Sequence, residues 1–223
     1  MSETTYSDLQ VLCNYKRLSF VRRFNNLPTI HTEDVSQHTF YVTILAMTLA
    51  DEYNTSVQKH NLETHPYDVE NVWNKVDTEL VMRQALLHDI EECFTSDIPW
   101  NVKHHSDATN STIKGIVRDK MKSIYSNCSP TLKRQIHLNM SSKLGLEGKI
   151  VAIADMLECA WNCFTEEQLG NKYLQGMKDK ALQEIEDMEF TETLYKTSEL
   201  FKSMMSMLKG KTSYIEMDKM NLE

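Results

Sequence analysis

Ionisable side chains stand in three otherwise apolar helical stretches of this sequence. His38 lies on the apolar face of a predicted helix, His88 and Asp89 close an apolar run, and Asp155 lies within "KIVAIADMLECAW". A carboxylate among such neighbours is costly unless it is paired or bound to a cation. Two imidazoles and two carboxylates form a mixed nitrogen and oxygen set that suits Mn²⁺, Co²⁺, Fe²⁺ or Zn²⁺, and Mg²⁺ less well.

Each of these residues taken alone has a simpler interpretation. His38 fits a core histidine with one hydrogen bond, Asp89 a solvated helix end, and Asp155 a salt bridge to a lysine or arginine. Together they predict one divalent ion with room for a water, and a metal-bound water of lowered pKa is a hydrolytic nucleophile. Glu92 follows His88 by four residues, so on one helix its carboxylate would reach such a water as a general acid or base.

The elements that must position these residues are predicted to be helices. Apolar residues recur at helical spacing, Gly (6) and Pro (4) are scarce, and no strand pattern occurs. Thr32 is the expected N-cap of the helix that carries His38. We therefore expect an all-α fold, with helices over residues 6–25, 33–54, 76–94, 108–127, 130–139, 147–168, 172–187 and 190–208.

Composition narrows the class of protein and its partners. A net charge of −8 argues against binding a nucleic-acid polymer, although a small phosphorylated ligand needs only a local positive site. The N-terminus lacks a signal pattern, and no apolar run is long enough to span a bilayer. The five cysteines contain no CxxC pair, which favours reduced thiols in the cytoplasm.

Three motifs in order resemble the HD-domain metal-dependent phosphohydrolases, and within them the YfbR-type 5′-deoxynucleotidases. "RRFNNLPTIHTEDVSQH" is similar to the opening motif of that group, "HDIEECFTSDIPWNVK" to its central segment, and "IADMLECAW" to its third metal-ligand helix. The resemblance covers residues 12–168. It implies one HD-domain helical bundle over residues 1–223, with that metal and catalytic core, additional helices over 172–208 and a polar tail over 209–223.

The resemblance also implies a role for each matching residue. Glu92 takes the catalytic acid position, Arg23 binds phosphate, and Asp97 contacts the sugar 3′-hydroxyl and disfavours a 2′-hydroxyl. The implied metal ligands are His38, His88, Asp89 and Asp155, and the substrate-binding positions are Arg23, Phe24, Asp97, Ile98, Pro99, Trp100 and Lys103.

The implied reaction is hydrolysis of a deoxynucleoside 5′-monophosphate by attack of a metal-bound water, with Mn²⁺, Co²⁺ or Zn²⁺ favoured over Mg²⁺. Phe24 departs from the family pattern, because the family carries Trp there and Phe lacks the indole N–H donor. A deoxynucleoside triphosphate hydrolase on the same scaffold is therefore an alternative. A catalytically silent nucleotide-binding module is a second alternative, which retention of Glu92, Arg23 and Asp97 disfavours.

Two further expectations concern a second ion and the oligomeric state. His104 and His105 follow the substrate segment and could bind phosphate or a second metal, although solvated loop histidines are the simpler interpretation. The resemblance implies a homodimer. The C-terminal stripe of Leu194, Phe201 and Met205, which continues to Leu208, fits either a subunit contact or the core of one chain.

Overall fold

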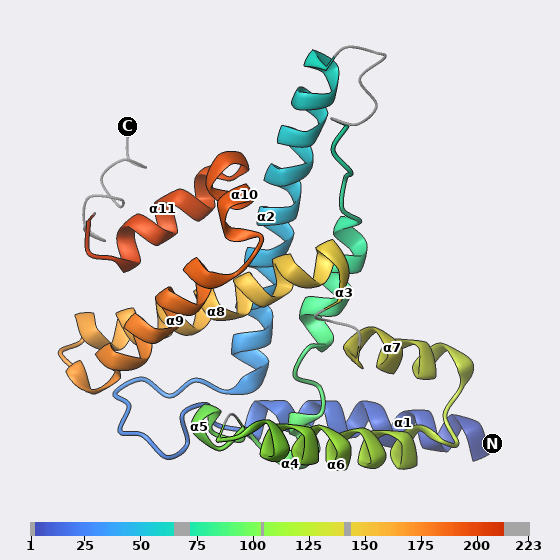
Figure 1. The fold of residues 1–223 in the computed structure, drawn as a ribbon. Helices are drawn as coiled ribbons and strands as arrows, with labels where there is room; N and C mark the ends of the chain where they lie inside the picture. Colours follow the sequence, from blue (N-terminus) through green and yellow to red (C-terminus); the bar gives the residue numbers. More distant parts are fainter. Residues whose placement is uncertain (1–2, 65–71, 104, 141–143, 212–223) are drawn as a thin grey trace, which may run out of the picture. The chain divides into compact units, whose positions relative to one another are not determined.

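The computed structural model describes residues 3–64, 72–103, 105–140 and 144–211 (Figure 1). Most of these residues are helical, and the one β contact among them is an isolated bridge between Arg22 and Asp34. The predicted all-α class is therefore confirmed. In this described part, no helix has the length and apolar character needed to cross a membrane.

The chain divides into two compact units, and two of its helices belong to both. Unit 1 comprises Met1–Tyr41 and Leu86–Ser142, and unit 2 comprises Val42–Ala85 and Lys143–Glu223. The prediction of a single domain over 1–223 stays a prediction. The helices are α1 (Glu3–Tyr15), the 3₁₀ helix η1 (Lys16–Phe20), α2 (Val35–Glu63), α3 (Thr78–Leu87), α4 (Glu92–Thr95), α5 (Trp100–Lys103), α6 (Asp107–Tyr125), α7 (Pro130–Met140), α8 (Gly145–Gln168), η3 (Lys172–Leu174), α9 (Gln175–Asp187), α10 (Thr191–Thr197) and α11 (Glu199–Leu208).

Unit 1 has its own apolar core, built where α1, η1, α4 and α6 contact one another. Tyr15 and Tyr125 add a partly buried polar contact, their hydroxyl oxygens lying 2.5 Å apart. This core supports the segments that carry the candidate site. Its buried members are Val11, Leu18, Val35, Ile90, Cys93, Met121, Tyr125, Cys128 and Leu132.

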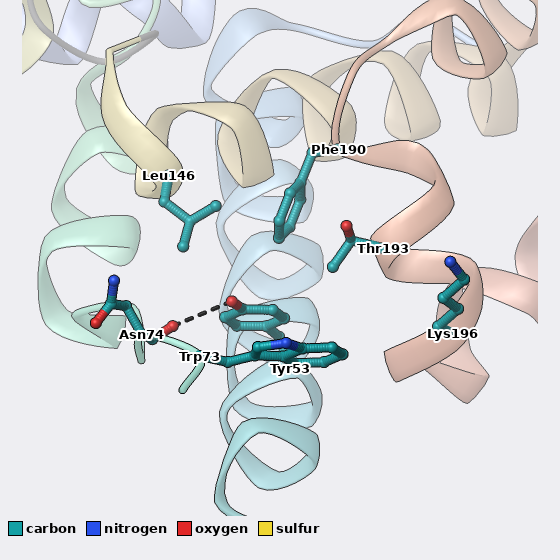
Figure 2. A pocket seen from close by; sticks show the side chains of 7 residues that line it. All are labelled: Tyr53, Trp73, Asn74, Leu146, Phe190, Thr193 and Lys196. Carbon is teal, nitrogen blue, oxygen red and sulfur yellow. Dashed lines mark hydrogen bonds between the residues drawn. The ribbon is translucent and has the colours of Figure 1, made fainter. Parts of the chain in front are cut away.

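Unit 2 is built around α8, which packs along α9 and also contacts α11 (Figure 1). The fully buried Leu157 and Phe201 belong to its core. A cavity of about 390 Å³ lies beside this core, and Figure 2 shows the Tyr53 hydroxyl donating to the Asn74 carbonyl there at 3.0 Å. None of the predicted site residues lines this cavity, whose walls are Tyr53, Trp73, Asn74, Leu146, Phe190, Thr193 and Lys196.

The first predicted helix and the predicted cap of the second differ from the structure. Helical structure ends at Phe20 rather than at residue 25, and α2 begins at Val35 with Asp34, not Thr32, as its cap. The Asp34 carboxylate accepts the Gln37 backbone N–H at 2.9 Å, while the Gln37 side chain accepts the Asp34 N–H at 3.0 Å. This reciprocal pair satisfies N–H groups that a helix start leaves without partners.

The predicted helix over 76–94 is also interrupted. α3 ends at Leu87, residues 88–91 form turns, and α4 begins at Glu92. Within this break, the N–H groups of Ile90 and Glu92 donate to carbonyls three residues earlier, at 3.2 and 3.0 Å. His88 and Glu92 therefore do not share one continuous helix face, and the turn brings His88 and Asp89 into the site instead.

Candidate active site

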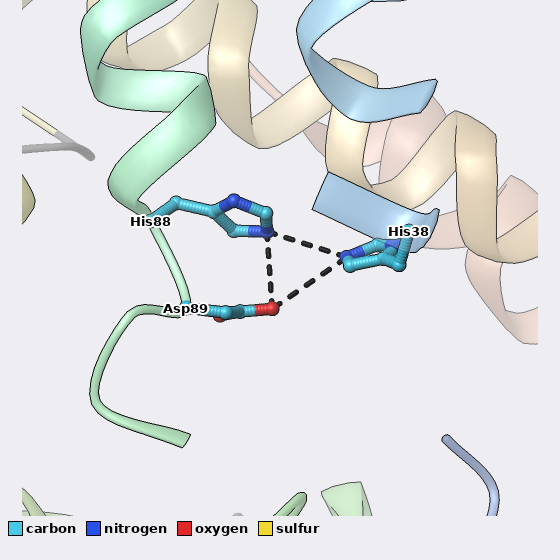
Figure 3. A group of neighbouring side chains, drawn as sticks. All are labelled: His38, His88 and Asp89. Atoms are coloured by element: carbon cyan, nitrogen blue, oxygen red, sulfur yellow. Dashed lines mark hydrogen bonds and ion pairs between the residues drawn. The ribbon is translucent and has the colours of Figure 1, made fainter. Parts of the chain in front are cut away.

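Three of the predicted metal ligands converge within unit 1. His38 comes from the first turns of α2, and His88 and Asp89 come from the turn after α3 (Figure 3). The Nε2 atoms of the two histidines lie 3.3 Å apart. Asp89 Oδ2 lies 3.1 Å from His88 Nε2 and 3.5 Å from His38 Nε2. Both imidazoles are buried, and the carboxylate keeps one edge toward solvent.

These distances fit donor atoms around a single ion. For metal–ligand distances of about 2.1 Å, neighbouring donors lie roughly 3.0 Å apart in octahedral and roughly 3.4 Å apart in tetrahedral coordination. The three separations in the cluster, 3.1, 3.3 and 3.5 Å, run from just above the octahedral value to just above the tetrahedral one. The cluster therefore could hold a metal ion on two nitrogens and one oxygen.

The charge state of Asp89 suits the same purpose. Burial alone would raise the pKa of Asp89, but the His88 and His38 imidazoles outweigh it and hold that pKa well below its usual range. The carboxylate is therefore ionised across the neutral pH range, and an ionised carboxylate is the form that ligates a cation.

Glu92 forms the second part of the site. Its Oε1 accepts from Lys103 Nζ at 3.0 Å, because the short helix α5 after Pro99 directs Lys103 back toward α4. Its Oε2 is buried and has no hydrogen-bond partner among the described residues. The Glu92 side chain is 4% exposed and that of Lys103 is 33% exposed, so the ammonium group is reachable from solvent.

The surroundings of Glu92 favour its protonated form. Burial raises the pKa of Glu92 to about 8, the nearby charge of Asp89 and more weakly that of Asp97 add to this rise, and Lys103 opposes it. The Glu92 N–H donates to the Asp89 carbonyl at 3.0 Å, so this acid belongs to the same turn as the metal-ligand cluster. An acid with this pKa can give and take protons near neutral pH.

The loop between η1 and α2 carries the predicted phosphate-binding residue. The two ends of this loop are joined by a hydrogen bond in which the Arg23 N–H donates to the Glu33 carbonyl at 2.9 Å. The Arg23 side chain pairs with the buried Glu33 carboxylate at 3.4 Å and lies over the Phe24 ring, 5.2 Å from its centroid. These two contacts fix the direction of the guanidinium group.

Asp97 joins this loop to the segment after α4. Its Oδ2 accepts the Phe24 backbone N–H at 3.2 Å, and its backbone carbonyl accepts from Asn25 Nδ2 at 3.0 Å. Within the described residues, nothing donates to its other carboxylate oxygen, Oδ1. Asp97 therefore keeps one acceptor oxygen for a ligand.

Comparison with known proteins identifies the family. The sequence model described as "5′-deoxynucleotidase YfbR-like" matches residues 11–204. The chain belongs to this family. It is thus a hydrolase, as predicted. A 5′-deoxynucleotidase yfbR of Photorhabdus temperata is 24% identical to it over 186 residues, which are 80% of this chain and 87% of that protein.

Solved structures show that this YfbR-like chain has the HD-domain fold. An HD-domain phosphohydrolase of Listeria innocua matches with a TM-score of 0.70 and 21% identity, covering 95% of this chain and 96% of its own. The cyanophage S-2L HD phosphohydrolase DatZ, bound to dA and one catalytic Zn²⁺ ion, matches with a TM-score of 0.53 and 13% identity, over 87% and 95% of the two chains.

The remaining predicted site residues of this YfbR-like protein have different positions. Ile98 and Pro99 are half-buried between α4 and α5, whereas the side chain of Trp100 and all of His104 lie outside the described part. His105 is exposed. Asp155 lies half-buried on α8 in unit 2, so its assignment as the fourth ligand stays a prediction.

Sequence reasoning missed two residues that contact the predicted substrate residues. Glu33 stands out in the sequence only as an acid at a helix start, although its carboxylate orients Arg23. Asn25 lies in a polar loop and contacts Asp97, which is 72 residues away in the chain. No local pattern could have revealed this long-range hydrogen bond.

Proposed function

We propose that this protein is a metal-dependent phosphohydrolase of deoxynucleotides, and in particular a 5′-deoxynucleotidase that releases phosphate from deoxynucleoside 5′-monophosphates. The observation that carries the proposal is the cluster of His38, His88 and Asp89, whose donor atoms lie 3.1 to 3.5 Å apart, together with the buried acid Glu92. Family membership supports the reaction class.

His38, His88 and Asp89 would hold one divalent ion, with Asp155 as a proposed fourth ligand on the strength of the family resemblance. Such an ion supplies Lewis acidity toward the phosphate and lowers the pKa of a coordinated water. DatZ, which shares the fold, binds a catalytic Zn²⁺ ion, and this supports Zn²⁺, Mn²⁺ or Co²⁺ over Mg²⁺ for a site with two imidazoles.

Glu92 would handle the protons of the reaction. Water adds to phosphorus, the bond between phosphorus and O5′ breaks, and O5′ takes a proton from the Glu92 carboxyl group. Oε2 is the atom suited to this transfer, since Oε1 already accepts from Lys103. The ionised Glu92 then takes up the proton that the attacking water releases, which restores its starting state.

Cations of the same unit would bind the phosphate. Arg23 is oriented by Glu33 and can present guanidinium N–H groups to phosphate oxygens. Lys103 is one-third exposed and can contribute its ammonium group from the opposite chain segment. Ile98, Pro99 and Trp100, which lie between Asp97 and Lys103 in the sequence, would form the wall of the substrate pocket.

Asp97 would select the deoxyribose. An ionised carboxylate only accepts hydrogen bonds, and one of its oxygens already accepts the Phe24 N–H. The remaining oxygen can accept a hydrogen bond from the 3′-hydroxyl and would leave a 2′-hydroxyl without a good acceptor. That DatZ binds dA is consistent with a deoxynucleoside ligand for this fold.

A deoxynucleoside triphosphate hydrolase is the second candidate, and Phe24 is the observation that favours it. Where the family carries Trp, the Phe24 ring lies under the Arg23 guanidinium group and offers no N–H donor to a single 5′-phosphate. A catalytically silent nucleotide-binding module is the third candidate. The buried Glu92 carboxyl group disfavours it, because binding alone does not need a general acid.

One screen separates these candidates. The purified full chain is incubated with each deoxy- and ribonucleotide and with Mn²⁺, Co²⁺, Zn²⁺ or Mg²⁺, and released phosphate, pyrophosphate and triphosphate are measured separately. Phosphate from deoxynucleoside monophosphates supports the first proposal, whereas triphosphate from deoxynucleoside triphosphates supports the second. Binding without turnover under every condition would leave only the silent module. A Glu92→Gln protein purified in parallel controls for contaminating phosphatases.

Two broader expectations, a homodimer and a cytoplasmic location, stay predictions. The alternative that His104 and His105 bind a second metal ion, rather than being solvated loop histidines, is also open to test. The homodimer is tested by sedimentation velocity and the second metal ion by metal content per chain.

A further inference from the structure

Asn25 makes a contact that neither the family motifs nor the reaction explains. Its side-chain Nδ2 donates to the backbone carbonyl of Asp97 at 3.0 Å. Directly beside it, the Phe24 backbone N–H donates to the Asp97 carboxylate at 3.2 Å. Two successive residues of one loop therefore bind both the backbone and the side chain of Asp97. We name these two hydrogen bonds the Asp97 clamp.

The backbone on both sides of the clamp is strained. Among the described residues, only Phe24 (φ 51°) and Ser96 (φ 61°) are non-glycine residues with positive φ. Phe24 donates one bond of the clamp, and Ser96 directly precedes Asp97 with a ψ of 168°, in a region that almost only glycine adopts. Such conformations persist only where surrounding contacts hold them, and the clamp supplies contacts to both segments.

We propose that Asn25 is a positioning residue that holds Asp97 in the orientation needed to recognise the sugar. This inference rests on the proposed function of Asp97. Without the Asn25 hydrogen bond, the Phe24 N–H is the one contact of the clamp that remains on Asp97, and the carboxylate can turn away from it more easily. Both carboxylate oxygens are then available to hydroxyl groups, and discrimination between deoxyribose and ribose falls.

The neighbouring residue provides a matched control. Asn26 is also an exposed asparagine of the same loop, and no hydrogen bond from its side chain occurs among the described residues. Substituting Asn26 tests the loss of an amide from this loop without loss of the clamp. Asn25→Asp keeps the size of the side chain but, when ionised, cannot donate.

The first measurement is steady-state kinetics with the metal-loaded full chain, using a deoxynucleotide and its ribonucleotide counterpart. Asn25→Ala and Asn25→Asp should each lower kcat/KM for the deoxynucleotide by roughly 3- to 10-fold, the size of one hydrogen bond, and narrow the deoxy-to-ribo ratio by a similar factor. Asn26→Ala should match wild type in both, and Asn25→Gln, which keeps a donor, should recover part of the ratio. Metal content should stay unchanged, and Tm should fall by no more than the roughly 2–4 °C that loss of one hydrogen bond costs in a chain of this size.

The second measurement is amide hydrogen exchange of residues 22–27 and 96–99, which reports on the clamp even if the chain hydrolyses no nucleotide. Faster exchange of the Phe24 N–H in Asn25→Ala, but not in Asn26→Ala, supports the clamp. Equal exchange in all three proteins overturns it. If exchange changes but the deoxy-to-ribo ratio of an active enzyme does not, the positioning role is wrong. An inactive wild type would instead refute the proposed function, and exchange alone would then decide whether the clamp exists.

Discussion

At the scale of single residues, Glu92 is a buried carboxyl group with one oxygen that has no hydrogen-bond partner in the described part of the chain. That oxygen is Oε2, whereas Oε1 accepts from Lys103. A buried oxygen without a partner is normally destabilising. An oxygen in this state is consistent with a group that exchanges protons with a ligand. Two measurements test the protonation of Glu92 separately from metal binding.

Glu92→Gln should lose most of the turnover and keep the metal. Gln preserves the shape of the side chain and a contact with Lys103, but it cannot transfer a proton, and general acid–base groups contribute typically about 10²- to 10⁴-fold. Initial rates and metal content per chain are compared with Glu91→Gln, which changes the preceding acid. A kcat within a few-fold of wild type would refute the role, and loss of metal would make Glu92 a ligand instead.

The raised pKa of Glu92 predicts how the stability of the metal-free protein depends on pH. The carboxyl pKa is about 8 in the folded chain and near its ordinary value of 4.5 when unfolded, so between these values the folded state binds the extra proton. The stability contributed by the neutral acid is present below pH 4.5 and is lost as pH rises toward about 8, by up to ~1.4 kcal/mol per pH unit. Denaturant titrations should show this loss in wild type and a smaller loss in Glu92→Gln. Parallel pH profiles would show that Glu92 titrates normally.

His38 and His88 are expected to be essential for metal binding. Their Nε2 atoms lie 3.3 Å apart, and both rings are buried, so replacement of either by Ala removes one of few donors. After chelation and reconstitution, His38→Ala and His88→Ala should bind Zn²⁺ or Mn²⁺ more weakly by well over the roughly 10- to 100-fold that loss of a supporting residue costs. His137→Ala, on the surface of α7, should bind like wild type. Unchanged affinity in both site variants would exclude this cluster as the metal site.

At the scale of elements, the sequence predicted helix identity better than helix boundaries. The apolar periodicity from residue 76 to Phe94 indicates one helix, but the structure interrupts it after Leu87. No Gly or Pro in the sequence marks this break. The chain turns there through hydrogen bonds between residues three apart, such as the bond from the Glu92 N–H to the Asp89 carbonyl at 3.0 Å. The position of His88 relative to Glu92 is therefore set by the turn over residues 88–91, which apolar periodicity does not predict.

The start of α2 allows a direct test of one corrected prediction. Asp34 bonds the Gln37 N–H at 2.9 Å, whereas the predicted cap, Thr32, is exposed and precedes the helix by three residues. Asp34→Ala should lower the free energy of unfolding by about 0.5–2 kcal/mol. Thr32→Ala should stay within about 0.5 kcal/mol of wild type. Denaturant titration of the metal-free proteins measures both, and a larger loss for Thr32→Ala would restore the original assignment.

At the scale of the whole molecule, the all-α class and the order of the helices followed from the sequence, whereas the contacts between distant segments did not. Periodicity reports which face of a helix is apolar, but not which other segment covers it. The contacts of Asp97 with Phe24 and Asn25 join residues that are 73 and 72 positions apart, respectively. The motif resemblance placed Asp97 and Arg23 in one site, and only the structure shows the loop between η1 and α2 that joins them.

The last prediction concerns whether the two compact units unfold together. Helix α2 runs without interruption from Val35 to Glu63 and passes from unit 1 to unit 2 after Tyr41. Helix propagation is cooperative, so unfolding one unit alone would have to break a continuous helix. We therefore expect a single thermal transition with equal calorimetric and van't Hoff enthalpies.

Substitutions in the two cores make this expectation testable. Met121→Ala in unit 1 and Leu157→Ala in unit 2 each remove a buried side chain and should cost about 2–5 kcal/mol. If the units are coupled, each substitution lowers the same single Tm, while the control Leu62→Ala, at a side chain that is 79% exposed, leaves it unchanged. If calorimetry instead resolves two transitions, each shifted by only one substitution, the units are separate domains. The single-domain prediction would then be wrong, because the continuous helix would not transmit unfolding across the boundary.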